Sequence, residues 1–430
     1  MHLIGMHGLD TAYLKNGYVY HTHLDKEDIL KDGTFLNTGA NVLQLSKALS
    51  LSTEADFDGS EPILDPGLEG SVFFDILSGF LFFSYRGNWV YGIHLLVVVC
   101  GASTVFLQCN SAYFHLSSML ADETKCVLFP IICNLAFGLF CHVVCPMTWY
   151  QSGKGYAILL FLPPALLSAL WVRGKCVAAR SYLSDSAVVR QASAIFMWIA
   201  IASPMILFGL VSAYPICFWI GFSSIGMIMY SQVLNANSLT SRKAQAHLSS
   251  SLTYQKILQK CDENVVYMVC LMPCTICWCS LLNIVLTMLI PLAGKSGTIV
   301  PGDIIVAAVI GALVSLPAGS LMANHVTSKV NLVTLKAIAS VIVMILFFTT
   351  IFNNVAYSTQ RPKRLWLQHV DRSIDKTLNG QVVTTTHDHG LWVSAFDGHA
   401  GRDTSAPITA ARIMSPGTML LANFLSRICT

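Results

Sequence analysis

The stretch Trp89–Leu107 reads WVYGIHLLVVVCGASTVFL and contains no Asp, Glu, Lys or Arg. An α-helix needs roughly 20 predominantly apolar residues to cross the ~30 Å hydrocarbon core of a bilayer. A backbone inside lipid must satisfy its own hydrogen bonds, and a helix does so within one segment. The stretch therefore predicts a membrane-spanning helix.

Seven further apolar runs follow, separated by short polar loops. They are Cys126–Cys145, Tyr156–Val172, Ala192–Leu210, Tyr214–Leu234, Val265–Ile290, Ile304–Met322 and Leu332–Phe352. Lys336 is the only Asp, Glu, Lys or Arg in the eight runs. Charged residues inside a membrane usually mark ion or proton pathways, so their scarcity argues against a proton-coupled or sodium-coupled transporter. The sequence thus predicts an α-helical polytopic membrane protein with about eight spans.

The composition agrees with this fold class. Of the 430 residues, 54% are hydrophobic and 11% are charged, whereas soluble domains have about 25% charged residues. The lipid bilayer is therefore the expected partner, and the net charge of +3 is too small to indicate a nucleic-acid partner. Most of the 14 cysteines lie in the apolar runs, where a thiol behaves as a small apolar side chain.

The loops indicate which side of the membrane each end of the chain occupies. The first, third, fifth and seventh loops hold ten Lys and Arg residues, and the other three loops hold two. Because Lys and Arg favour cytoplasmic loops, the odd loops are expected in the cytosol. Eight spans then place both termini on the other side. The basic cluster Arg361–Arg364, directly after the last run, counts against this topology.

The residues before the first span are polar in character. Asn16-Gly17 predicts a turn, followed by a short strand at Val19 and Tyr20. A helix is expected from Asp25 to about Leu51, because acidic residues favour the first turn of a helix. The segment Thr53–Gly70 has the composition of a linker, and Val72–Tyr85 is too short to span a bilayer.

The residues after the last span predict a small antiparallel β unit. Apolar and polar residues alternate from Leu365 to Val370. Asn379-Gly380 is a hairpin turn signal, and Val382–Thr386 and Leu391–Phe396 follow it as candidate strands. The final stretch, Ala411–Thr430, loses this pattern.

Three groups of residues have spacings that a metal ion could use. They are Cys141-His142 with Cys145, Cys274 with Cys277 and Cys279, and the polar cluster His387, Asp388, His389, Asp397, His399 and Asp403. A structural zinc site needs four converging ligands, and one helix presents only the residues at i, i+3 and i+4. We therefore interpret the cysteine groups as membrane packing and the last cluster as solvated loop residues.

Four stretches, in order along the chain, resemble a known family. They are Gly8–Ala12 with Gly17–Asp25, Val72–Leu77, Pro291–Gly297 ahead of Pro301, and Arg361–His369 with Gly390–Asp397. Together they are similar to the endoplasmic reticulum metallopeptidases, the Felix-ina-like members of the two-zinc metallopeptidase family 28. The resemblance covers nearly the whole chain to about Pro407, and each motif alone is weak.

The resemblance implies a domain organisation and a location. The family has a lumenal peptidase domain, a multi-span membrane domain and a lumenal C-terminal domain. For this chain we expect a peptidase-domain remnant with α/β structure at residues 1–52, a linker and short apolar segment at 53–88, the membrane domain at 89–352 and a β-rich C-terminal domain at 353–430. The resemblance also implies the endoplasmic reticulum membrane, with both termini in the lumen.

By the same resemblance, His21 corresponds to the last zinc ligand of the peptidase site. In the family, two zinc ions polarise the scissile carbonyl and activate a water molecule, and a glutamate takes the proton. The other ligands and this glutamate lie upstream of the last histidine. Only 20 residues precede His21 here, and none of them is Glu. We therefore expect one metal ligand, no catalytic residue and no zinc bound by this chain.

The sequence therefore predicts a fragment of an endoplasmic reticulum membrane zinc metallopeptidase that is itself inactive towards peptides. Two alternatives remain open. One is a membrane scaffold or regulatory pseudoenzyme, which requires a protein partner that the sequence does not identify. The other is a multi-span transporter or channel.

Overall fold

The computed structural model describes most of the chain between residues 16 and 395. The described residues are 16–51, 72–76, 80–85, 87–109, 113–179, 187–243, 262–295, 300–323, 337, 340–344, 348, 356–358, 360–378 and 381–395. The predicted linker Thr53–Gly70 and the final stretch Ala411–Thr430 lie outside these residues.

Seven helices in the described part are long and apolar enough to cross a membrane. They are α2 (Gly87–Cys109), α3 (Tyr113–Val144), α5 (Lys154–Ala179), α6 (Ala187–Leu207), α7 (Tyr214–Lys243), α9 (Glu263–Ala293) and α10 (Gly302–Leu321). Each contains all or nearly all of one of the first seven predicted runs. The predicted class, an α-helical polytopic membrane protein, is confirmed. The eighth run, Leu332–Phe352, lies largely outside the described residues.

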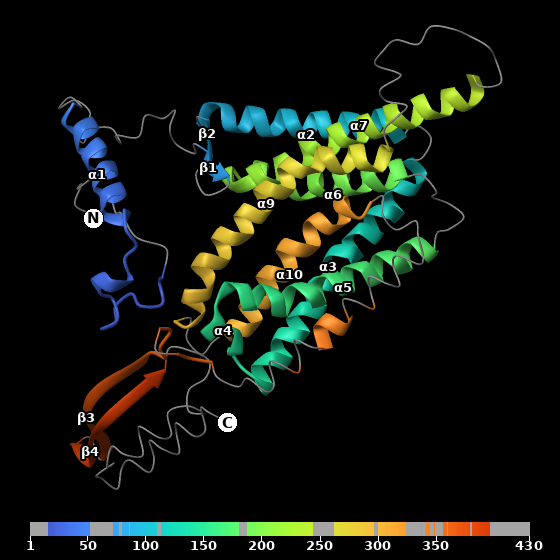
Figure 1. Ribbon diagram of the computed structural model, residues 1–430. Coiled ribbons are helices and arrows are strands. Elements are labelled where there is room, and N and C mark those ends of the chain that lie inside the picture. Colours follow the sequence, from blue (N-terminus) through green and yellow to red (C-terminus); the bar gives the residue numbers. More distant parts are fainter. Residues whose placement is uncertain are drawn as a thin grey trace.

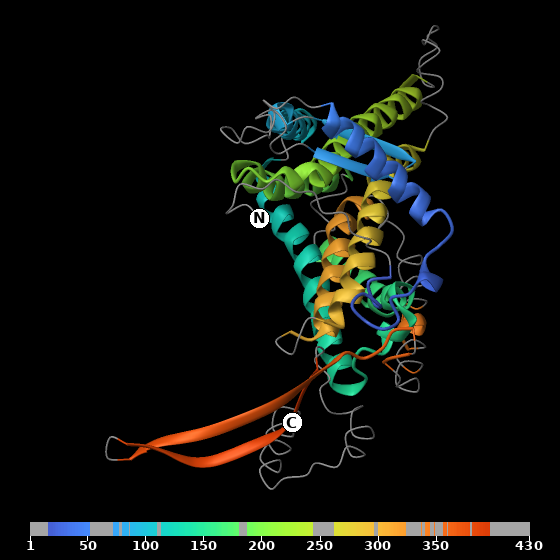
Figure 2. The same ribbon diagram turned by 90° about the vertical axis from the view of Figure 1, so that its left-hand side faces the viewer.

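The seven helices pack in two groups that share contacts (Figures 1 and 2). Helices α2, α6 and α7 contact one another, and α9 packs on α7, whereas α3, α5 and α10 form the second group. Contacts of α10 with α9 and of α3 with α6 join the groups. Two short elements connect spans, namely α4 (Thr148–Ser152) between α3 and α5, and η5 (Val211–Ala213) between α6 and α7.

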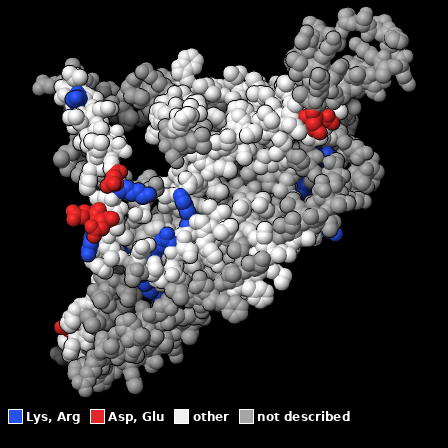
Figure 3. All heavy atoms as spheres, viewed as in Figure 1, with Lys and Arg blue, Asp and Glu red and all other residues white. Residues whose placement is uncertain are grey.

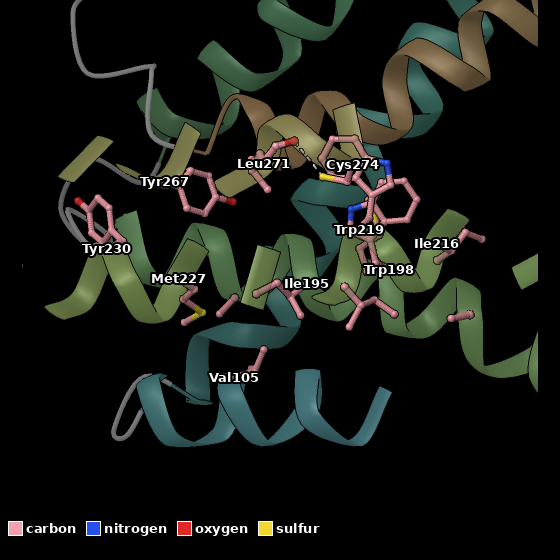
Figure 4. Close-up of a cluster of buried hydrophobic side chains, with 14 of the residues drawn as sticks. Val105, Ile195, Trp198, Ile216, Trp219, Met227, Tyr230, Tyr267, Leu271 and Cys274 are labelled. Atoms are coloured by element: carbon pink, nitrogen blue, oxygen red, sulfur yellow. Dashed lines mark hydrogen bonds between the residues drawn. The ribbon is translucent and has the colours of Figure 1, made fainter. Parts of the chain in front are cut away.

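A cluster of three tryptophans joins α6, α7 and α9 (Figure 4). The rings of Trp198 and Trp219 are stacked with centroids 5.6 Å apart, and Trp278 meets both edge-on. The Nε1–H of Trp198 donates to Ser320 Oγ at 2.9 Å, and that of Trp278 donates to the carbonyl oxygen of Leu313 at 2.6 Å. Both acceptors belong to α10, so buried indole groups bind the two helix groups together.

Helices α3 and α10 approach closely because small residues line their contact. A Cβ added to Gly138 would lie 2.6 Å from Ala307 Cβ and 3.0 Å from the carbonyl oxygen of Asp303. Small residues allow such an approach in membrane bundles. Asn134 Nδ2 donates to the carbonyl oxygen of Ala307 at 2.7 Å. This hydrogen bond between α3 and α10 adds to their close packing.

The short apolar segment before α2 is a β-hairpin of β1 (Val72–Ile76) and β2 (Leu81–Tyr85). The side chains of β1 alternate between buried and exposed, as a half-buried strand requires. Val72 and Phe74 are buried against residues of α2, α7 and α9, whereas Phe73 is exposed. The ring of Phe74 stacks on Tyr214 with centroids 4.5 Å apart. The hairpin therefore rests on the helical bundle and does not span.

The N-terminal segment contains η2 (Glu27–Ile29) and α1 (Thr34–Ser50). The predicted single helix from Asp25 to Leu51 is wrong in its first part, because Gly33 has φ +82° and interrupts the helix. Within α1, Leu36 and Leu43 are exposed at 77% and 56%.

A long β-hairpin lies at the other end of the described chain, formed by β3 (Leu365–Leu378) and β4 (Gln381–Ala395). The strands are antiparallel, and Leu378 pairs with Gln381 across the position of the predicted Asn379-Gly380 turn. This confirms the predicted antiparallel pairing. Val382–Thr386 and Leu391–Phe396 were predicted as separate strands, but residues 382–386 and 391–395 both belong to the single strand β4. The irregularity in register falls between Ile374 and Asp375.

Candidate functional site

The candidate site surrounds His21, in a series of tight turns. Val19 N–H donates to the carbonyl oxygen of Asn16 at 3.1 Å, and Thr22 N–H donates to that of Val19 at 2.9 Å. The Thr22 hydroxyl also donates to the Val19 carbonyl, at 2.6 Å. Local side-chain bonds of this kind compete with regular secondary structure. The strand predicted at Val19 and Tyr20 is therefore wrong, and these residues form turns.

His21 itself has a left-handed backbone and an exposed side chain. Its φ is +61°, a conformation that costs energy for residues other than glycine. The imidazole stacks on the ring of Tyr20 with centroids 3.8 Å apart. Within the described ranges, no three His, Cys, Asp or Glu side chains converge as metal ligands. The described residues therefore do not fit a two-zinc site around His21, and we derive no catalytic step through one.

Two cations hold the backbone that leads into His21. The Arg364 guanidinium donates to the carbonyl oxygen of Tyr18 at 2.9 Å and also to that of Tyr20. The Lys295 ammonium donates to the carbonyl oxygen of Gly17 at 3.0 Å and lies 5.1 Å from the centroid of the Tyr20 ring. Hydrogen bonds from charged donors are about twice as strong as neutral ones. We call Arg364 and Lys295 the cation clamp.

Burial and like charge both act on the clamp. Partial burial lowers the pKa of Lys295, and the nearby Arg364 charge lowers it further. Lys295 lies between α9 and α10, and Arg364 lies directly before β3. The clamp thus brings three distant parts of the chain together: the His21 turns, the loop before α10 and the start of the C-terminal hairpin (Figure 1).

Aromatic residues complete the contact. The ring of Tyr18 meets that of Tyr150 edge-on at 5.3 Å, and Tyr150 meets Tyr357 at 5.6 Å. The guanidinium of Arg361 lies 4.8 Å from the centroid of the Tyr18 ring and donates to the carbonyl oxygens of Tyr150 and Gln151. Burial raises the pKa of the Tyr18 hydroxyl, and the Arg361 charge opposes this shift. On the face in Figure 3, charged side chains gather on the left, with a second, smaller group at the upper right, and the described surface between the two groups is largely uncharged.

A buried carboxylate organises the bundle next to this junction. Asp303, at the start of α10, is fully buried and accepts hydrogen bonds from Met147 N–H at 3.0 Å and from Trp149 Nε1–H at 2.7 Å. The Nδ1 atom of His142 lies 3.5 Å from its Oδ2. Met147 has φ +54°, so Asp303 stabilises a strained turn between α3 and α4. In the cysteine group beside it, Cys141 and Cys145 are core residues.

A second buried charge cluster lies at the opposite ends of the same helices. Glu123 of α3 forms a buried ion pair with Arg173 of α5, and Ser193 Oγ of α6 donates to Glu123 at 3.3 Å. Arg190 Nε donates to the carbonyl oxygen of Ala323, just past α10, at 2.7 Å. These charged residues lie outside the predicted apolar runs, because the helices extend beyond the runs. On these extensions, Glu123 and Arg173 pair between α3 and α5.

Comparison with known proteins shows what the chain is similar to. No protein-family model and no solved structure matches the chain. Endoplasmic reticulum metallopeptidase 1 of Rattus norvegicus is 22% identical over 418 residues, which cover 91% of this chain and 42% of the relative. The protein of the same name from Homo sapiens is 21% identical over 414 residues, with the same two coverages. The chain is similar in sequence to these endoplasmic reticulum metallopeptidases over most of its own length.

The match extends across 91% of this chain, in agreement with the resemblance seen in its motifs. The chain spans 42% of the length of the curated relatives it matches. No motif signal in the sequence indicates that Lys295 or Arg364 would contact the His21 turns. Both residues do lie in stretches that resemble the metallopeptidase family, and this is the one sequence feature that links them.

Proposed function

We propose that this chain serves as the membrane-embedded part of a membrane zinc metallopeptidase, and that residues 16–51 belong to the end of its peptidase domain. The observation that carries the proposal is the cation clamp. It attaches the turns around His21 to the membrane domain through Lys295 and to the C-terminal hairpin through Arg364. The relatives named as endoplasmic reticulum metallopeptidases support the same assignment.

The proposed orientation puts the His21 turns and the β3–β4 hairpin in the lumen of the endoplasmic reticulum. The excess of Lys and Arg in the odd loops supports it. The Glu123–Arg173 pair lies near those loops, whereas the clamp lies at the ends of the helices joined by the even loops. The Arg361–Arg364 cluster, which counts against this orientation in the sequence, is bound here to carbonyl groups and rings.

The orientation can be tested with glycosylation sites placed on both sides. Gln381→Thr creates an Asn-Gly-Thr acceptor in the C-terminal hairpin, and Ser249→Asn creates an Asn-Ser-Ser acceptor in the fifth loop. Such acceptors are modified only in secreted or lumenal regions. We expect glycosylation of the Gln381→Thr variant alone. Modification of the Ser249→Asn variant would reverse the proposed orientation.

The proposed activity of the whole family member is hydrolysis of peptide bonds with two zinc ions, which polarise the carbonyl and supply an activated water when bound. We propose that this chain by itself has no peptidase activity. In the resemblance to the family, His21 is the only zinc ligand assigned to this sequence. A single neutral imidazole does not hold a zinc ion in a structural or catalytic coordination shell.

A zinc measurement tests this proposal directly. We expect less than about 0.1 zinc ion per purified chain, because a stable site needs at least three protein ligands. The His21→Asn variant and the matched His23→Asn variant should give the same low content. Near-stoichiometric zinc that is lost in His21→Asn and retained in His23→Asn would show a complete site, and peptide hydrolysis by that protein would refute the inactive assignment.

One observation favours a second candidate, a transporter or channel. Buried ionisable residues such as Glu123, Arg173 and Asp303 are functional candidates in membrane proteins by default. Each has a structural role here, however, since Glu123 and Arg173 pair with each other and Asp303 accepts two hydrogen bonds. Proton uptake into reconstituted vesicles that disappears in Glu123→Gln would favour the transporter.

A further inference from the structure

We propose that Arg364 and Lys295 are positioning residues for His21: they fix the direction of its imidazole from the membrane domain and the C-terminal segment. The inference rests on the proposed function in one respect, namely that His21 is a metal ligand in the family member. The clamp itself depends only on the contacts of this chain.

The two cations make several hydrogen bonds to a short length of backbone before His21. The carbonyl oxygens of Gly17, Tyr18 and Tyr20 accept hydrogen bonds from the two cations. A guanidinium presents several donors in a rigid plane, so one Arg364 can fix two carbonyls in one relative orientation. The peptide that leads into His21 is therefore held on the side facing the bundle.

The backbone of His21 is strained. Its left-handed φ of +61° is an unfavourable conformation that persists only where the surroundings enforce it. The clamp binds the Tyr20 carbonyl, which belongs to the peptide unit immediately before His21. It thereby restricts the torsion that sets where the imidazole points.

The ring of Tyr20 lies in contact with both Lys295 and His21. The ammonium of Lys295 lies 5.1 Å from its centroid, and the imidazole of His21 is stacked on it at 3.8 Å. Cations on aromatic rings and offset ring stacks both prefer defined geometries. Lys295, Tyr20 and His21 therefore form a continuous chain of contacts from the loop before α10 to the imidazole.

The test measures the His21 turns in the complete 430-residue chain in detergent micelles. Hydrogen exchange, read by mass spectrometry on peptides that cover residues 16–26, reports local opening of the backbone. We expect Arg364→Ala to raise exchange there about tenfold, because charge-assisted bonds are lost. Lys363→Ala is the matched control, since this neighbouring cation lies over the Tyr357 ring and should leave exchange unchanged. Arg364→Lys should restore part of the protection.

A second readout follows the imidazole itself. The NMR signal of ring-labelled His21, identified by its loss in His21→Asn, should be displaced by the Tyr20 ring current, and the displacement should fall in both Arg364→Ala and Lys295→Ala. The proposal is overturned if exchange is unchanged in Arg364→Ala, if Lys363→Ala has the same effect, or if the histidine signal stays in place while exchange rises. The zinc measurement above decides the proposed function separately, because neither readout here depends on metal.

Discussion

Glu123 and Arg173, 50 residues apart in the sequence, form an ion pair that is buried where α3, α5 and α6 meet. Removing one partner of a buried pair leaves the other charge without compensation, whereas removing both can be nearly neutral. The pair therefore gives the bundle a defined arrangement of helices at this end, even where its net contribution to stability is small.

The first prediction concerns this pair. Arg173→Ala should lower the free energy of unfolding by about 3 to 5 kcal/mol, because the Glu123 carboxylate then remains buried and uncompensated. Equilibrium unfolding in mixed micelles measures the change. The double variant Glu123→Gln with Arg173→Met should recover more than half of the loss. Lys175→Ala, at an exposed cation over the Trp171 ring, is the control and should cost at most about 1 kcal/mol. Equal losses in the single and double variants would contradict the account.

The second prediction concerns Asp303. Asp303→Ala should cost about 1 to 3 kcal/mol for each buried donor left without a partner, namely Met147 N–H and Trp149 Nε1–H. The indole N–H signal of Trp149, assigned with Trp149→Phe, should also move and exchange faster with solvent. Asp303→Asn keeps one acceptor and should lose less. An unchanged indole signal in Asp303→Ala would show that this contact does not hold the turn.

The third prediction concerns the contact of α3 with α10. Gly138→Ala should destabilise the protein by about 1 to 3 kcal/mol, because its Cβ would overlap Ala307 and the backbone of α10. Gly92→Ala is a matched control within α2, since a Cβ there meets nothing within 4 Å. The control should be neutral or more stable by up to about 1 kcal/mol, from helix propensity alone. The same unfolding assay compares the two, and equal effects would refute the close approach.

The fourth prediction concerns the charge of Lys295. Burial and the adjacent Arg364 lower the pKa of this lysine. Arg364→Ala should raise that pKa towards its ordinary value, because the like charge is removed and the loosened turns admit more water. Titration of ¹³C-methylated lysines by NMR measures it. Lys154→Ala is the control, since Lys154 bonds to Asn283 and Thr287, and it should leave the Lys295 pKa unchanged. A lower pKa in Arg364→Ala would contradict the assigned cause.

The sequence predicts the spans well because lipid imposes a simple condition on them. A long uncharged run has no stable alternative to a helix in a bilayer, so runs such as Trp89–Leu107 correspond to observed helices. The helix ends were less predictable. Glu123 and Arg173 look like loop residues in the sequence, and only the packing of α3 on α5 shows that each charge has a partner.

The candidate site was predictable only in part. The resemblance singled out His21, but composition and spacing alone give no reason to prefer it to His23. Its neighbours in space come from far along the chain, since Lys295 and Arg364 are separated from the carbonyls they bind by 278 and by 346 or 344 positions. Hydrogen bonds to backbone carbonyls leave no complementary side-chain pattern in the sequence. Local strand propensity at Val19 and Tyr20 also gave the wrong structure, because the Thr22 hydroxyl and these distant donors favour turns.

The acceptors of the cation clamp are main-chain oxygens, which every amino acid possesses. Mutational tolerance on the two sides of the junction should therefore be unequal. Gly17 can change chemically while still offering a carbonyl to the clamp, whereas the donors Lys295 and Arg364 have no such freedom. Substitutions during evolution can therefore change the exposed side chains of the His21 turns while the hydrogen bonds that attach these turns to the membrane domain are kept.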